Sequence, residues 1–243
     1  MIHFRKRTIQ GAVTVMGVLA GLGGAVTQAQ ETDSPSPKPQ IKADNPALRS
    51  PGKPSAVAAE SPQAKNQELE RLAKAADKVL NRIQSAESDL YLRLSYFEKP
   101  GRLDPNSYAS KDEVEQWQGM LQQLKEKHDL VARLYADVGK DLDAALLNTS
   151  ANGETAARFK KYIMDGFPWE TIEKKNSLLA EFIDEQSKLL LFYEKNWGSW
   201  TNASDSNKPE FTSASAANIY KRLRDQILKT SEELEKEYKA ISE

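Results

Sequence analysis

The sequence predicts an all-α protein, an up-down-up-down four-helix bundle of long amphipathic helices. Beyond residue 65, large apolar residues recur at steps of three and four, which is the spacing that lines one face of an α-helix. No alternating apolar and polar run of useful length indicates a β-sheet. The links at residues 99–109 and 198–212 are short, and short links favour antiparallel neighbours in helical bundles.

The first helical segment is predicted to begin at Asn66 and to stop at Pro100 and Gly101. Proline has no amide hydrogen to donate within a helix and glycine weakens helical order, so the pair forms a clear stop signal. Leu94 and Phe97 extend the apolar face of this segment after a slip of one residue. The face itself consists of Leu69, Leu72, Ala76, Val79, Ile83, Ala86 and Leu90.

The second segment has the most regular pattern, because its apolar positions alternate at steps of three and four without a break, as in a heptad repeat. Ser110 is predicted to cap its first turn, with Glu113 reaching back to complete a capping box. The same regularity supports an alternative fold, a long helical hairpin of the first two segments that dimerises. The positions are Val114, Trp117, Leu121, Leu124, His128, Val131, Tyr135, Val138, Leu142 and Ala145.

Two further long helices are predicted toward the C-terminus. The third begins at Pro168, since proline suits the first turn of a helix, and ends near Trp197. The fourth follows the candidate capping residues Thr212 and Ser213. A short helix is predicted at residues 154–164. The third face is Ile172, Leu179, Phe182, Ile183, Leu189, Leu190 and Tyr193, and the fourth is Ile219, Leu223, Ile227, Thr230, Leu234, Tyr238 and Ile241.

Residues 1–29 have the pattern of a bacterial secretory signal peptide. Arg5, Lys6 and Arg7 form a basic start, and an uncharged apolar stretch follows. Small residues at Thr27 and Ala29 suit a cleavage site after Ala29. The sequence therefore predicts a periplasmic or secreted protein with no membrane span after cleavage, and the alternative is a signal that is kept as an anchor.

Residues 30–65 are predicted to form a proline-rich disordered linker that leads into a helical bundle domain at residues 66–243. This linker holds seven of the eleven prolines and no aromatic residue. Such a composition cannot bury enough apolar surface to offset the entropy lost on ordering. We interpret it as a tether or as an unselected tail.

Charge and composition exclude several classes of function. Residues 66–243 contain 26 basic and 31 acidic residues, a net charge of −5, which argues against a nucleic-acid partner. The chain has no cysteine, and His128 is its only histidine outside the signal peptide. No glutamate precedes His128 by three residues, as a di-iron bundle requires. We expect no metal, no cofactor and no enzymatic activity.

Aromatic residues gather at the predicted links, and an up-down-up-down bundle brings those links to one end. They are candidates for binding because loop tryptophans combine a large apolar ring with one polar group. The alternative is that they close the end of the bundle against water. These candidate residues are Trp197, Trp200, Tyr96, Phe97, Tyr108 and Phe211.

The function predicted from these features is that of a non-enzymatic interaction or scaffold module in the bacterial envelope. Long helices offer faces to a protein partner or to a second copy of the chain. The alternative is a binding module that takes a small molecule or a cell-wall glycan at the aromatic end.

Overall fold

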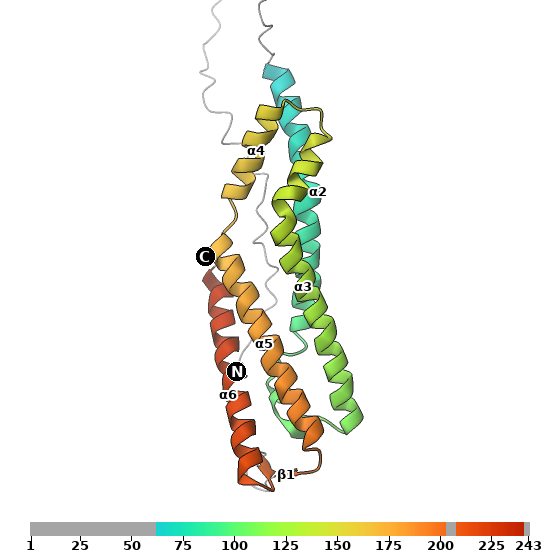
Figure 1. Cartoon of the computed structure of the whole chain (residues 1–243), viewed down its shortest axis with the longest axis vertical. Coiled ribbons are helices and arrows are strands. Elements are labelled where there is room, and N and C mark those ends of the chain that lie inside the picture. The colour runs from blue at the N-terminus through green and yellow to red at the C-terminus, as the bar shows by residue number, and fades with distance from the viewer. Residues whose placement is uncertain (1–61, 203–207, 241–243) are drawn as a thin grey trace, which may run out of the picture. The chain divides into compact units, whose positions relative to one another are not determined.

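The computed structural model describes residues 62–202 and 208–240, and these residues are predominantly helical (Figure 1). The predicted signal peptide at residues 1–29, residues 30–61 of the predicted linker, and Ile241 lie outside the described residues. The predicted all-α class is confirmed. The helices are α2 (Pro62–Leu94), α3 (Lys111–Leu147), α4 (Gly153–Asp165), α5 (Trp169–Lys195) and α6 (Ala214–Ala240), with 3-10 turns η2 (Pro100–Leu103) and η3 (Pro105–Ser107).

The chain divides into two units, and the packing described below belongs to one of them. Residues from Arg71 onward form a compact unit, whereas the stretch Thr14–Glu70 belongs to the other. Only the start of α2, residues 62–70, is described in that second unit. Helix α2 begins at Pro62, a few residues before the predicted start, because proline is well tolerated in the first turn of a helix.

Consecutive long helices run in opposite directions. Arg93, late in α2, donates to Gln123 in the first half of α3 at 2.7 Å. Arg82, earlier in α2, pairs with Asp141 near the end of α3. Helices α3 and α5 are related in the same way, because Gln118 donates to Glu194 at 3.1 Å and His128 lies 3.0 Å from the Asn176 carbonyl. In α5 and α6, Lys174 lies 2.5 Å from Glu237. Figure 1 shows α5 between α3 and α6.

The start of α3 follows the predicted capping box with one change. The Ser110 hydroxyl accepts the Glu113 amide at 3.1 Å, as predicted. The Glu113 carboxylate, however, accepts the amide of Ala109 at 2.8 Å, one residue before the expected donor. The predicted short helix is present as α4. Helix α5 begins at Trp169, so Pro168 precedes the first turn instead of lying within it.

Except at Tyr135, the buried face of α3 agrees with the predicted seam as far as Leu142. At the last turn Leu146 is buried at 4% exposure, and Ala145 is only partly buried. The reason is geometric, since an α-helix has 3.6 residues per turn and drifts away from a strict seven-residue repeat. Tyr135 is also only partly buried, and its hydroxyl donates to Glu87 on α2 at 2.8 Å.

Helix α5 buries more than its predicted face. Leu178 and Phe192 are buried in addition to the predicted residues, and so are the polar residues Glu185 and Gln186. Burial raises the pKa of the Glu185 carboxyl, although a hydrogen bond to Thr230 on α6 opposes this shift. A helix packed against α3 on one side and α6 on the other needs a wider apolar surface than a single stripe.

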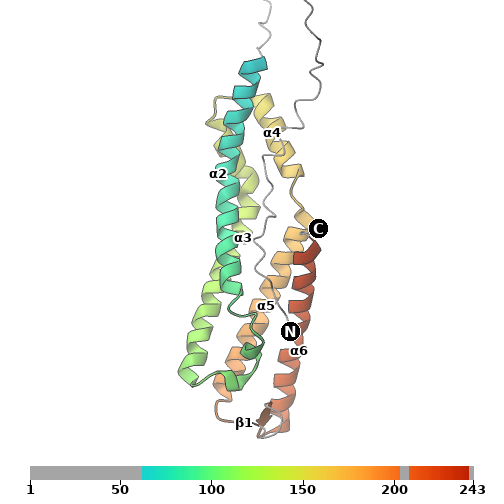
Figure 2. The same ribbon diagram turned by 180° about the vertical axis from the view of Figure 1, so that it is seen from behind.

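The link between α5 and α6, which the sequence predicted only as a short connection, contains a short strand pair. Strands β1 (Trp200–Asn202) and β2 (Pro209–Phe211) are antiparallel and lie at the end of the α5–α6 pair (Figure 2). Trp200 pairs with Phe211. Gly198 precedes them at φ +79°, a conformation that glycine adopts without a steric penalty. The start of α6 also differs from the prediction, because Ile219 is 38% exposed and Ala216 takes the buried position.

None of the helices in the two described ranges is both long enough and apolar enough to cross a lipid bilayer.

Candidate functional site

The aromatic residues of the α5–α6 link pack mainly on one another. The Trp197 and Trp200 rings meet edge to face with centroids 5.3 Å apart. Trp200 also lies 5.9 Å from Phe211 and 6.0 Å from Tyr193. Phe211 in turn lies 5.0 Å from Tyr220 on α6. Tyr193 is fully buried at the centre of these contacts. The rings therefore form one continuous aromatic cluster between α5, α6 and the strand pair.

Tyrosine hydroxyls tie this cluster to the η2 and η3 turns. Tyr193 and Tyr220 both donate to the carbonyl of Leu103, at 2.9 and 2.8 Å. Tyr108 donates to the carbonyl of Arg102 at 3.0 Å. Burial raises the pKa of all three hydroxyls, that of Tyr220 to about 12. They stay protonated at neutral pH and serve as hydrogen-bond donors that hold the link after α2.

Of the predicted site residues, Trp197, Trp200 and Phe211 lie in the aromatic cluster, which Tyr108 joins with its ring 5.6 Å from that of Tyr193. Phe97 does not join this cluster and packs on a different ring.

The Phe97 ring is buried against Trp117, with centroids 5.3 Å apart. The Arg102 guanidinium lies 3.7 Å above the Trp117 ring and 5.8 Å from Tyr108, so a cation bridges the two groups of rings. Tyr96 is 40% exposed and has no ring contact within the described part of the chain. Binding of a glycan at this end stays a prediction.

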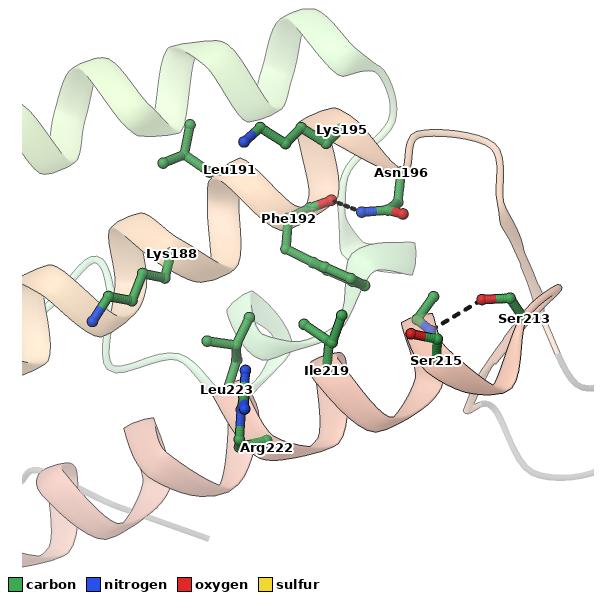
Figure 3. A pocket seen from close by; sticks show the side chains of 11 residues that line it. Lys188, Leu191, Phe192, Lys195, Asn196, Ser213, Ser215, Ile219, Arg222 and Leu223 are labelled. Carbon is green, nitrogen blue, oxygen red and sulfur yellow. Dashed lines mark hydrogen bonds between the residues drawn. The ribbon is translucent and has the colours of Figure 1, made fainter.

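A groove of about 540 Å³ lies between the end of α5 and the start of α6. Its floor is apolar. Phe192 points from α5 toward α6, and Ile219 and Leu223 point back from α6 (Figure 3). Leu191 lies at its edge and is 42% exposed.

Local hydrogen bonds fix the end of the groove. The Asn196 side chain donates to the carbonyl of Phe192 at 2.8 Å and so closes the last turn of α5. The Ser213 hydroxyl accepts the amide of Ala216 at 3.0 Å and caps the first turn of α6. These two hydrogen bonds fix the end of α5 and the start of α6 beside the apolar floor of the groove.

The charged residues of the groove lining are all basic. They are Lys188 and Lys195 on α5 and Arg222 on α6. Lys188 lies 2.5 Å from Asp184, whose hydrogen bond and charge raise the pKa of the lysine. Lys195 and Arg222 form no ion pair with any acid in the described residues. The groove therefore combines an apolar floor with two cations that form no ion pair among the described residues.

Sequence reasoning missed this groove, although one signal was present. Residues 189–193 form an unbroken apolar run, and five consecutive apolar residues point to every side of a helix. Such a run cannot be buried by one neighbour alone, so some of it must either contact a second helix or face solvent. Here Leu191 is the residue that stays exposed.

A second, smaller hollow lies between α3 and α5, at about 270 Å³. His128, Asp129 and Asp184 are among its lining residues, with polar side chains from both helices. The His128 ring is held by the Asn176 carbonyl at 3.0 Å. Within the described residues, no group of three or more histidines, aspartates and glutamates is arranged to hold a metal ion.

No protein family, no curated protein and no solved structure gives a significant match to this chain.

Proposed function

We propose that the chain is an exported, non-enzymatic interaction module that binds a protein partner at the α5–α6 groove. The observation that carries this proposal is the apolar floor of the groove, with Leu191 and Ile219 exposed at 42% and 38%. Apolar side chains gathered in a solvent-open hollow mark protein interaction sites more often than isolated exposed residues do.

The scaffold of this module is an up-down-up-down four-helix bundle of α2, α3, α5 and α6. Three antiparallel contacts between consecutive helices support it. Contacts between the first and last helices support closure, because the rings of Tyr91 on α2 and Tyr238 on α6 meet edge to face at 5.2 Å. Lys175 of α5 lies 5.5 Å and 4.9 Å from the centres of these two rings.

Delivery to the envelope rests on the sequence. Residues 1–29 act as the signal peptide, and residues 30–61, which precede α2, act as a tether. Proline at six positions favours an extended segment, at about 3.1 Å per residue where the polyproline II conformation persists.

Site-specific photo-crosslinking in the bacterial envelope tests the proposal. A photoreactive phenylalanine analogue replaces Ile219 or Leu191 in the groove, and Leu147, which is 83% exposed at the end of α3, serves as the control position. We expect a discrete adduct with one protein from both groove positions and none from position 147. Equal adducts from all three positions, or none from the groove, contradict a groove-based interaction.

A further inference from the structure

We infer that the α5–α6 groove takes an amphipathic helix with acidic flanks, presented by a different protein. This inference rests on the proposed function and specifies the chemistry of the partner. It follows from the shape of the floor, from the sign of the charges beside it, and from what each rival occupant would need.

The floor fits a short stretch of helix. Ile219 and Leu223 are spaced by four residues on α6, so they lie on one face a turn apart. Phe192 faces them from α5, while Leu191 lies at the edge of the groove and points away from α6 (Figure 3). The lining residues on α6 extend from Ala216 to Leu223, so the groove is about two helical turns long, roughly 11 Å. A partner helix fills such a groove with apolar residues at positions i, i+3 or i+4, and i+7.

The charges beside the floor select an acidic partner. Lys195 and Arg222 come from opposite helices, one on each side of the floor, and neither has an acidic neighbour within ion-pair distance in the described residues. This positive rim lies on a domain whose net charge is −5. Acidic side chains beside the apolar stripe of a partner helix would meet both cations and set its orientation.

A second copy of the chain fits the same groove poorly. In a two-fold dimer the same surface meets itself, so the basic rims of the two copies would face each other. Like charges brought together across an interface cost free energy unless acids separate them.

A small ligand also fits less well, because ligand pockets enclose most of the ligand surface. The groove lies open along the seam between two helices (Figure 3). Nor does a flat anionic membrane reach Phe192 and Leu223, which are only 8% and 7% exposed at its base.

Fluorescence anisotropy with two synthetic peptides tests the inference on the full chain. Both peptides carry the same leucine stripe at helical spacing, and the stripe is flanked by glutamates in one and by lysines in the other. We expect the glutamate peptide to bind at least about tenfold more tightly, and added salt to reduce this difference, because the rim charges are exposed to solvent. Equal binding of the two peptides overturns the inference.

Variants assign the binding to the groove. Ile219→Ser should weaken binding of the glutamate peptide about tenfold, because it removes an apolar contact. The matched change Leu147→Ser should leave the affinity unaltered. Leu191→Ser is the second groove variant, should the first not fold. The double change Lys195→Glu with Arg222→Glu should reverse the preference so that the lysine peptide binds more tightly. An unchanged preference overturns the inference.

Three further results separate the rivals. A dimer in light scattering that Ile219→Ser dissociates would identify a second copy as the occupant and overturn the inference. Groove-dependent binding to vesicles of phosphatidylglycerol, with no preference between the peptides, would overturn it in favour of a membrane. Crosslinks from position 219 without any preference for the glutamate peptide would overturn the inference that the partner is acidic. They would leave the proposed function standing.

Discussion

Glu98, just after α2, carries a carboxyl group whose charged form is disfavoured by its surroundings. Burial raises its pKa to about 7, and the nearby charge of Glu235 on α6 adds to the shift. A carboxyl group whose pKa is higher in the folded state than in the unfolded state favours folding when it is protonated. That contribution is complete below the unfolded pKa near 4.5 and is lost as the pH rises through about 7.

Replacing Glu98 with glutamine should therefore flatten the dependence of stability on pH. For the unchanged chain we expect the free energy of unfolding to fall by about 2 kcal/mol from this group between pH 5 and pH 8. Glu98→Gln should lose most of that fall, because the amide does not titrate. Urea unfolding at a series of pH values measures how the free energy of unfolding depends on pH. Glu115→Gln on the exposed face of α3 is the control, and the same slope in all three proteins would contradict the assignment to Glu98.

At the scale of elements, the link between α2 and α3 depends on one carbonyl group. Leu103 is buried, and its carbonyl accepts hydrogen bonds from Tyr193 on α5 and Tyr220 on α6. Each hydroxyl can act as the remaining donor if the other is lost. The η2 and η3 turns are thereby fixed to both C-terminal helices, and the aromatic cluster closes around this point.

This arrangement predicts that the two tyrosines are coupled. Tyr193→Phe and Tyr220→Phe should each cost about 1 kcal/mol of unfolding free energy, because the carbonyl keeps one donor. The double variant should cost about 3 kcal/mol, more than the sum, because a buried carbonyl then has no donor. Chemical denaturation of the four proteins gives the coupling energy. Strict additivity would show that the two hydrogen bonds act independently.

The elements differ in how far the sequence predicts them. Features within one helix are predictable, since spacing and capping are local, and the Ser110 cap and most of the α3 face agree with the structure. The strands β1 and β2 were not predicted, because three-residue strands are too short to show alternation. The exposure of Ile219 was missed because the pattern gives a face but not where the neighbouring helix ends.

At the scale of the whole molecule, the groove could not be located from the sequence. It forms where α5 and α6 lie side by side, and Lys195 and Arg222 become neighbours only through that packing. The aromatic end was predictable in part, because link residues of an antiparallel bundle meet at its ends. The exception is Tyr96, whose neighbour Phe97 turns inward onto Trp117 while Tyr96 itself faces solvent.

The predicted export of the chain has a direct test. Protein recovered from the periplasm of a bacterial host should begin at Gln30, because the small residues Thr27 and Ala29 suit signal peptidase. Intact-mass spectrometry measures the N-terminus. Ala29→Phe should block processing, whereas Gln28→Leu, between the two small residues, should not. A chain that keeps Met1 and sediments with the membrane would establish the anchor alternative instead.

The position of α5 also governs how the chain comes apart. Because α3 covers one side of this helix and α6 the other, the backbone amides on its buried faces exchange with water only after one of those partners detaches. Deuterium uptake at these α5 amides thus reports the rarest opening of the unit. Among the larger contacts described, α4 packs on α3 alone, so we expect α4 to open at lower free energy. Fraying of α4 would leave the α3–α5–α6 contacts intact.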